Sequence, residues 1–410
     1  MKKQLLLFVF MLSAVMLSQE LPDLAPPTPE VAAMGKYLDV PVSLFTGTPN
    51  ISIPLASISE GMLSASVSLS YHASGIRVGE MASRVGLGWS LHGGGMISRQ
   101  VRGIADDHTE GFINTSNTID HYFAQDANGR AQLFQSAISD NQDFESDVYH
   151  INVAGLSGKF FFNQNGTIVM HQKSDLKVVA LRDGITISGW QVTTPEGVLY
   201  SFGEIPGTTQ QVDEIKETRF FSQATNLPSR IIEHTTGWYL TQISDYRGNQ
   251  INFNYTKGTQ QITYWNITGQ SKNLLGIGSG CGSSNTEPIS LTEDKYTPTY
   301  LSSITTTQGS IVLEYNDTRI DLKNDKALTG VKLLDSNNVT IDRYVLEQGY
   351  FTSPGGMEHL LNYGDTDQRT KRLYLKTITQ QKGSTDNKVH RFTYNQAHQL
   401  PERFSFSQDL

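Results

Sequence analysis

Short runs in which every second residue is apolar constrain the fold of this chain more than any other feature. Such alternation occurs at residues 40–45, 51–55 and 67–71, where VPVSLF, ISIPL and VSLSY are flanked by Gly, Pro, Asn or Ser. Successive side chains of a β-strand point to opposite faces, so this period places the apolar residues on one face. Pro41 and Pro54 lack a backbone N–H, so we expect them at sheet edges or strand ends.

Turn dipeptides link many of these runs into hairpins. Asn165-Gly166 lies within KFFFNQNGTIVMH, and Asp183-Gly184 lies within VVALRDGITIS. Both dipeptides suit tight turns that need positive φ at their central residues. GWQVTTPEGVLYSFG, residues 189–203, predicts a third strand–turn–strand unit around Pro195-Glu196-Gly197.

The C-terminal part repeats one hairpin pattern. Residues 239–255 and 300–315 both read Y-L-x-x-I, then a Gly turn, then I-x-[FL]-x-Y. A looser copy spans 373–394, and residues from 328 to 346 have the same rhythm without the Gly turn. A lone hairpin cannot bury its apolar face, so neighbouring units must stack. The sequence therefore predicts an all-β fold of antiparallel strands and stacked hairpins, arranged as an elongated or curled sheet.

Composition supports this fold class and excludes some functions. Charged residues make up 18% of the 410 residues, and no 12-residue window shows a convincing helical period with caps. Residues 30–36 form at most one short helical turn. The formal net charge of −8 comes with no Lys/Arg-rich run, so the chain lacks the electrostatic footprint of a nucleic-acid-binding protein.

The first residues predict export. Lys2 and Lys3 precede an apolar run, Leu5 to Leu17, which is shorter than the ~20 residues of a spanning helix. We interpret residues 1–19 as a signal peptide, with an N-terminal membrane anchor as the alternative. Residues 20–36 are Pro-rich and predict an extended linker. A β domain over 37–230 and the hairpin region over 231–410 complete the predicted organisation.

The chain contains one cysteine, Cys281, in the Gly/Ser run GIGSGCGSSN. A single cysteine forms no intramolecular disulfide, so stability must come from core burial. A reactive thiol there is the alternative to an inert loop residue, and the sequence favours the loop residue. The surrounding segment, about Gly269 to Pro288, predicts a surface loop.

GWSLHGGG, residues 88–95, combines part of a G-x-S-x-G nucleophile elbow with an H-G-G-G oxyanion loop. His92 replaces the last Gly of the elbow, and Gly93–Gly95 disfavour the helix that must follow Ser90. No G-x-S-x-G occurs elsewhere in the chain. We therefore interpret the stretch as a connection between strands, with Trp89 and Leu91 in the core and MISRQV as the next strand.

Candidate metal and binding residues are sparse. His72, His92 and His108 lie 20 and 16 residues apart and share no predicted face. The acidic clusters at 106–111 and 139–147 do not match the calcium loop, and we expect solvated loops there. A carboxylate pair for glycoside hydrolysis remains open. Alternating aromatic residues such as Phe253 and Tyr255 predict core packing over an exposed binding stripe.

Several segments together resemble a known family. Residues 35–55, 67–103 and 193–203 are similar to the N-terminal region of large exported RHS/YD-repeat proteins of the Bacteroidetes type. The run S-L-S-Y … G-L-G-W-S-L … I-S-R, within 67–103, also resembles the entry segment of toxin-complex B components. LPERFSFSQDL, residues 400–410, is similar to a segment that continues into more chain. The resemblance covers most of residues 35–410.

The resemblance implies a hollow shell of stacked hairpins that can enclose a C-terminal toxin or effector. The family's autoproteolytic carboxylates lie in a core segment that this sequence does not match. The repeats also depart from the family pattern, since Asn316 and Asn395 follow Tyr315 and Tyr394 where Asp is frequent. The chain is therefore similar to an N-terminal piece of such a protein.

We accordingly expect a non-enzymatic structural segment of an exported, extracellular or cell-surface protein. It would start or cap a β shell, with downstream repeats and a C-terminal effector as partners, and with no nucleic acid. We assign no catalytic, cofactor-binding or metal-binding residue and no cofactor. The alternatives are a cell-surface adhesin or carbohydrate-binding β module, and a secreted hydrolase at Ser90.

Overall fold

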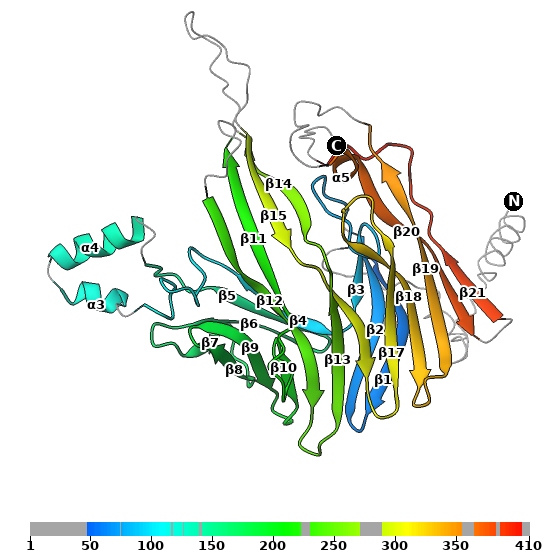
Figure 1. The fold of residues 1–410 in the computed structure, drawn as a ribbon, viewed down its shortest axis with the longest axis horizontal. Coiled ribbons are helices and arrows are strands. Elements are labelled where there is room, and N and C mark those ends of the chain that lie inside the picture. The colour runs from blue at the N-terminus through cyan, green and yellow to red at the C-terminus, as the bar shows by residue number, and fades with distance from the viewer. Residues whose placement is uncertain are drawn as a thin grey trace, which may run out of the picture. The chain divides into compact units, whose positions relative to one another are not determined.

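A computed structural model of the chain describes residues 47–73, 75–115, 118–125, 127–138, 142–222, 230–270, 289–354, 365–382 and 386–403 (Figure 1). Nearly all of these residues belong to one compact unit, Ser52–Leu410. Antiparallel strands dominate it, which confirms the predicted all-β fold class. The predicted signal peptide, the Pro-rich linker, the run at 40–45 and Cys281 lie outside the described residues.

A three-stranded sheet opens the described chain. Its order is β1 (Asn50–Glu60), β2 (Leu63–His72) and β3 (Trp89–His92). Pro54 lies in β1, at the edge of this sheet, as its missing N–H predicts. Alternate residues of β2 are buried, and Val67 and Leu69 are fully buried. The period-two pattern therefore identified this strand and its inner face correctly.

The remaining strands form a paired system that branches at β12 (Arg230–Ser244). The first half of β12 pairs with β4 (Gly95–Gln100) and β11 (Asp213–Ser222). Pairing continues from β4 through β5 (Val148–Val153) and β6 (Leu156–Phe162) to β7 (Ile168–Met170). From β11 it continues to β15 (Ile289–Tyr296) and β14 (Ile262–Gln270).

The second half of β12 pairs with β10 (Leu199–Phe202) and β13 (Gln250–Lys257). On one side the sheet continues through β9 (Thr186–Thr193) to β8 (Lys177–Asp183). On the other side it runs through β16 (Thr299–Thr305), β17 (Gly309–Thr318), β18 (Lys326–Asp335), β19 (Thr340–Thr352), β20 (Lys371–Lys382) and β21 (Asp386–Arg391).

The predicted hairpins are present. The pairs β6–β7, β8–β9 and β9–β10 enclose the three turns expected between residues 162 and 199, with positive φ at Gly166, Gly184 and Gly197. The four repeat units correspond to β12–β13, β16–β17, β18–β19 and β20–β21. In the unit that lacks a Gly turn, Asn338 takes the positive φ instead.

Large aromatic side chains fill the core between the two branches beside β12. Five fully buried rings meet there: Tyr149, Phe160, Phe162, Trp190 and Trp238. The centroids of Tyr149 and Trp190 lie 4.8 Å apart, and those of Trp190 and Trp238 lie 5.5 Å apart in an edge-on arrangement. Rings of this size contribute large apolar area, and such geometries add attraction between them. The core fixes the branches of β4–β7 and β8–β10 against each other.

The structure also contains short helices that the sequence pattern did not reveal. Helix α3 (Ile119–Phe123) and helix α4 (Ala127–Ile138) form a pair that lies beside the sheets, at the left of Figure 1. Thr118 caps α3 by accepting a hydrogen bond from the backbone of His121. Alpha4 is mostly exposed, so it carries no apolar stripe that a periodicity search would detect. A third short helix, α5 (Thr366–Thr370), begins after the cap Asp365.

No helix among the described residues is long and apolar enough to cross a membrane.

Candidate functional site

The glycine-rich stretch 88–95 connects the two sheet systems. Trp89 pairs with Tyr71 in the three-stranded sheet, and its buried ring lies 5.2 Å from that of Tyr71. Its indole nitrogen donates a hydrogen bond to the hydroxyl of Tyr394, 3.0 Å away. Trp89 is therefore the core anchor that the sequence predicted, whereas Leu91 is only half-buried.

MISRQV does form the next strand, but that strand leaves the sheet of β3. Gly93 and Gly94 separate β3 from β4, and β4 pairs with β5 and β12. Gly94 has φ +79°, and a Cβ on Gly95 would lie 2.5 Å from the Val153 side chain. These glycines let the backbone cross between sheets at close range.

This geometry does not support the hypothesis of a hydrolase with Ser90 as its nucleophile. Ser90 is exposed and stands opposite Ser70 on β2. His92 instead contacts Ser70, with 2.6 Å between Nε2 and Oγ. A Ser–His pair of this kind resembles a nucleophile and base, a feature that the sequence pattern did not reveal. No carboxylate contact to His92 is seen among the described residues, and a strand rather than a helix follows the turn.

A cavity of about 440 Å³ lies beside the glycine turn. Gly93–Gly95 form part of its wall together with Tyr239, Tyr255 and Tyr315, which come from three different strands. Burial raises the pKa of Tyr315 to about 12, and it raises the pKa values of the other two tyrosines further. Neutral hydroxyl groups and aromatic rings therefore line this cavity together with Arg84 and His92, which suits a small polar ligand.

Residues 82–88 are held on the sheet by a buried ionic network. Arg319 binds Asp321 through two nitrogens at 3.0 and 2.9 Å, and it contacts Asp325 at 3.0 Å. Arg84 contacts the other oxygen of Asp325 at 3.1 Å. Arg319 also donates to the backbone oxygen of Ala82. Each buried charge thus has a partner, as a low-dielectric interior requires.

A second buried network joins the two acidic clusters, so the expectation of solvated loops is wrong for their buried aspartates, while Glu110 and Glu145 are exposed as expected. Asp106, Asp107, Asp143 and Asp147 are all buried. The backbone N–H of Asp106 donates to Asp147 at 2.9 Å, and that of Asp147 donates back to Asp106 at 3.0 Å. This reciprocal pair fastens two loops that lie about forty residues apart. Backbone donors far away in sequence satisfy the carboxylates, so local composition could not indicate their burial.

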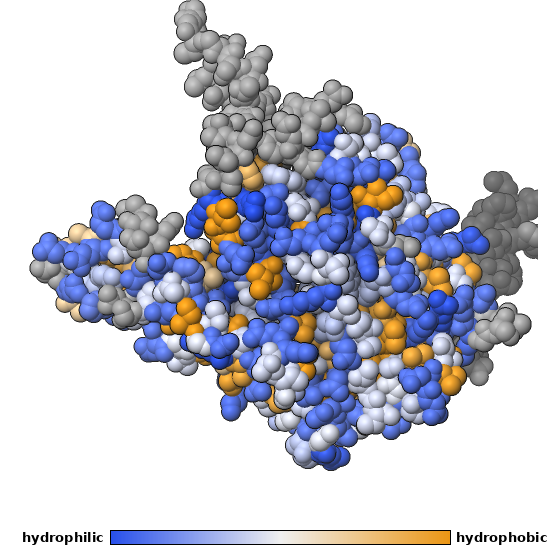
Figure 2. All heavy atoms as spheres, viewed as in Figure 1, coloured by the Kyte–Doolittle hydropathy of each residue, from blue (hydrophilic) through white to orange (hydrophobic). Residues whose placement is uncertain are grey.

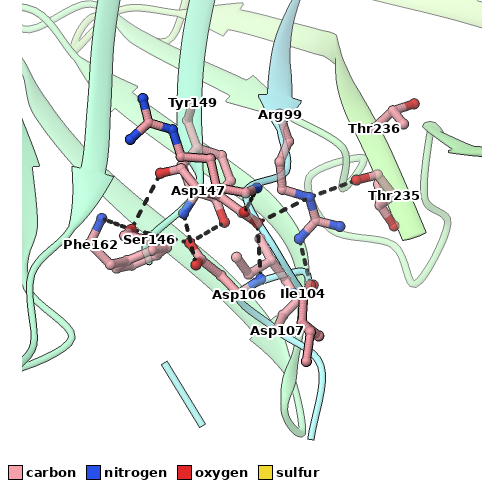
Figure 3. Close-up of polar contacts among 12 residues, drawn as sticks. Arg99, Ile104, Asp106, Asp107, Ser146, Asp147, Tyr149, Phe162, Thr235 and Thr236 are labelled. Atoms are coloured by element: carbon pink, nitrogen blue, oxygen red, sulfur yellow. Dashed lines mark hydrogen bonds and ion pairs between the residues drawn. The ribbon is translucent and has the colours of Figure 1, made fainter. Parts of the chain in front are cut away.

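The guanidinium of Arg99 faces this network (Figure 3). Its side chain extends from β4 and binds Asp107 and the backbone oxygen of Thr235, 2.7 Å away. Its Nε also lies 3.9 Å from Asp147. The hydroxyl of Tyr149 donates to Asp106 at 3.0 Å. The cluster therefore connects β4, β5 and β12.

Burial raises the pKa of the Asp106 carboxyl to about 6 and that of Asp147 to about 7. Loss of hydration is the main cause in both, and the charge of Asp106 adds to the rise at Asp147. Hydrogen bonds and Arg99 oppose the rise without cancelling it. Chemically, the pair can hold or release protons near neutral pH. Its hydrogen bonds join the two loops to each other.

The predicted candidate residues do not converge on a metal site. His92 and His108 belong to separate elements, with His108 exposed and 3.3 Å from Glu110. Among the described residues, no group of three or more His, Cys, Asp or Glu side chains is arranged to hold a metal ion. Phe253 is buried as predicted, while Tyr255 lines the cavity and donates to the backbone oxygen of Leu240.

No protein-family model matches the chain, and no curated protein matches it. Solved structures that are similar to it include toxin-complex components. The crystal structure of TcdB2-TccC3 matches 84% of this chain at 12% identity and a TM-score of 0.40. The Photorhabdus luminescens Tc holotoxin pore matches 84% at 12% identity and a TM-score of 0.36. This chain spans 16% and 15% of those longer chains.

Proposed function

We propose that this chain is a non-enzymatic structural segment of an exported RHS/YD-repeat protein of the Bacteroidetes type. In this proposal it starts or caps a β shell that encloses or presents a C-terminal effector. The motifs at 35–55, 67–103 and 193–203 support the family, and the run of paired strands from β12 to β21 supports the structural role.

The observation that carries the proposal is the outer edge of β21. Beta21 pairs with β20, and no other described strand pairs with it. Its residues 387–391 are all exposed. An open edge presents unpaired N–H and C=O groups, which normally need cover. We take its partner to be a further hairpin of the same repeat series.

The charge of this edge favours such a hairpin over a second copy of β21. Lys388 and Arg391 lie on the strand with Asp386, so two copies paired in parallel and in register would bring cations together. To test the proposal, the chain is co-expressed with a separate polypeptide of RHS/YD hairpin repeats. Co-purification through β21 is expected, and its loss in a Val389→Pro variant is expected because proline removes an edge donor.

Export is part of the same proposal. The basic residues and the apolar run before Ser18 support a cleaved signal peptide. Expression with the native N-terminus should give protein outside the inner membrane, with a new N-terminus near Gln19. Retention of Met1 in a membrane fraction would favour the alternative that residues 1–19 form an N-terminal membrane anchor.

A carbohydrate-binding β module is the second candidate, and the tyrosine-lined cavity beside Gly93–Gly95 favours it. Aromatic faces and neutral hydroxyls suit a sugar ring. A glycan array compares the chain with its Tyr255→Ala variant. Binding that the substitution abolishes would support this candidate, whereas no glycan binding would leave the structural role as the better account.

A further inference from the structure

A row of basic and polar side chains crosses the outer face of the β4–β7 branch. Ser98 on β4 pairs with His150 on β5, and His150 pairs with Lys159 on β6. The backbone N–H of His171, just after β7, donates to the backbone oxygen of Lys159 at 2.8 Å. Their neighbours Arg99, Tyr149 and Phe160 are buried on the opposite face. The alternation of a strand therefore directs the row away from the aromatic core.

A groove of about 910 Å³ lies over this row. Lys173 joins Lys159, His150 and His171 in its lining, and none of the lining residues is Asp or Glu. This is unusual in a chain with 40 acidic and 32 basic residues. Lys159 and Lys173 place positive charge along this groove without a lining carboxylate, so an anion bound there would be stabilised.

An adjoining cavity of about 620 Å³ extends the same surface. It shares His150, Lys159 and His171 with the larger groove. Its added charges, Arg102 and Glu145, are paired at 3.0 Å and largely neutralise each other. The excess positive charge therefore remains on the shared row.

The edge of β7 indicates the shape of the ligand. Beta7 pairs with β6, and no other described strand pairs with it. An extended peptide can add to such an edge through backbone hydrogen bonds. Every second side chain of that peptide would then lie on the face of the row.

We propose that the groove over His150, Lys159 and His171 binds an extended peptide with acidic residues at alternate positions, which pairs with the free edge of β7. This site is separate from the β21 edge and from the tyrosine-lined cavity. The carboxylates contact Lys159 and Lys173, and protonated imidazoles strengthen the contact.

The site should respond to pH. Burial and the neighbouring Lys159 lower the pKa of His150 in the free protein, so its imidazole is neutral near pH 7. The titratable groups that face it are Lys159, His171 and Lys173, with the Arg102–Glu145 pair at one end. A bound carboxylate favours the imidazolium, so affinity rises as pH falls from about 7.5 to about 5.5.

Fluorescence anisotropy of the full chain tests the proposal with a labelled peptide of alternating Glu and Thr. A peptide of alternating Gln and Thr is the matched ligand control. We expect saturable binding of the Glu peptide alone, tighter at acidic pH. Lys159→Gln should weaken it about tenfold, as loss of a charge-assisted contact implies.

Lys173→Gln, in the loop after β7, provides a second variant that leaves the sheet intact and should also weaken binding. Lys177→Gln, at the start of β8 and outside the lining, should leave binding unchanged. Equal binding of the Gln peptide, or no effect of either lining variant, would overturn the proposal. Displacement of the peptide by inorganic phosphate at equal concentration would also overturn it, because it would indicate a simple anion site.

Discussion

At the scale of single residues, buried polar groups connect segments that are distant in sequence. Asp106 and Asp147 accept each other's backbone N–H, and Asp325 joins Arg84 to Arg319. Each of these carboxylates would be costly to bury alone. Together they hold the glycine-rich connection and the acidic loops against the sheets.

The raised pKa values of Asp106 and Asp147 give stability a defined pH dependence. An unfolded aspartate has a pKa of about 3.9, so the folded chain holds more protons between about pH 4 and pH 7. The free energy of unfolding therefore falls as pH rises through this window, by at most about 1.4 kcal/mol per pH unit for each proton. Urea titrations between about pH 5 and pH 8 measure this slope.

Asp147→Asn should flatten that slope, because it removes one of the two titrating groups. It should also destabilise the chain at pH 5 by about 1–3 kcal/mol, since an amide cannot accept both backbone N–H groups. Asp175→Asn, at an exposed loop position, is the control and should leave the slope unchanged. An unchanged slope in Asp147→Asn would argue against titration of this pair.

Variants of Ser70 and Ser90 test the prediction that the chain is not a hydrolase. The structure pairs His92 with Ser70 and leaves Ser90 exposed. We expect the Ser70→Ala and Ser90→Ala variants to hydrolyse p-nitrophenyl esters at the same background rate as the unmodified chain. Loss of a measurable rate in either variant would show that the stretch is an active site after all.

At the scale of elements, local turn chemistry explains why most hairpins were predictable. Asn-Gly and Asp-Gly supply the turn, and the flanking alternation supplies the strands, all within about twenty residues. The partner of β4 was not predictable in this way, because Ser98 pairs with Gly237 on β12. Helix α4 was not predicted for a different reason, because an exposed helix needs no apolar stripe.

Two glycines with positive φ allow the cost of backbone strain to be measured separately from the cost of a steric clash. A Cβ on Gly86 would lie 2.6 Å from the backbone nitrogen of Leu375, whereas a Cβ on Gly166 meets nothing within 4 Å. Both residues have positive φ. Gly166→Ala should therefore cost only about 1 kcal/mol of conformational strain.

Gly86→Ala should cost about 3 kcal/mol, because β20 must also shift to make room. Thermal unfolding of the two variants measures the difference. Equal losses of stability would contradict the close approach of residues 86 and 87 to β20, where Leu87 donates to the backbone oxygen of Leu373.

At the scale of the whole molecule, the exposed apolar residues are spread over many elements and do not form one patch on the face that Figure 2 shows. On the face shown in Figure 2, apolar residues form small groups separated by hydrophilic ones. The face in this view therefore offers no large hydrophobic area for association. Further strands would therefore join through backbone edges, of which β21 is the one that follows the hairpin series.

Hydrogen exchange of the β21 amides tests this account most directly. The 410-residue chain is compared with a chain extended by one further RHS/YD hairpin repeat. The account predicts that alternate β21 amides exchange rapidly in the shorter chain and become protected in the longer one, because a following hairpin pairs with that edge. Equal exchange in both chains would contradict it.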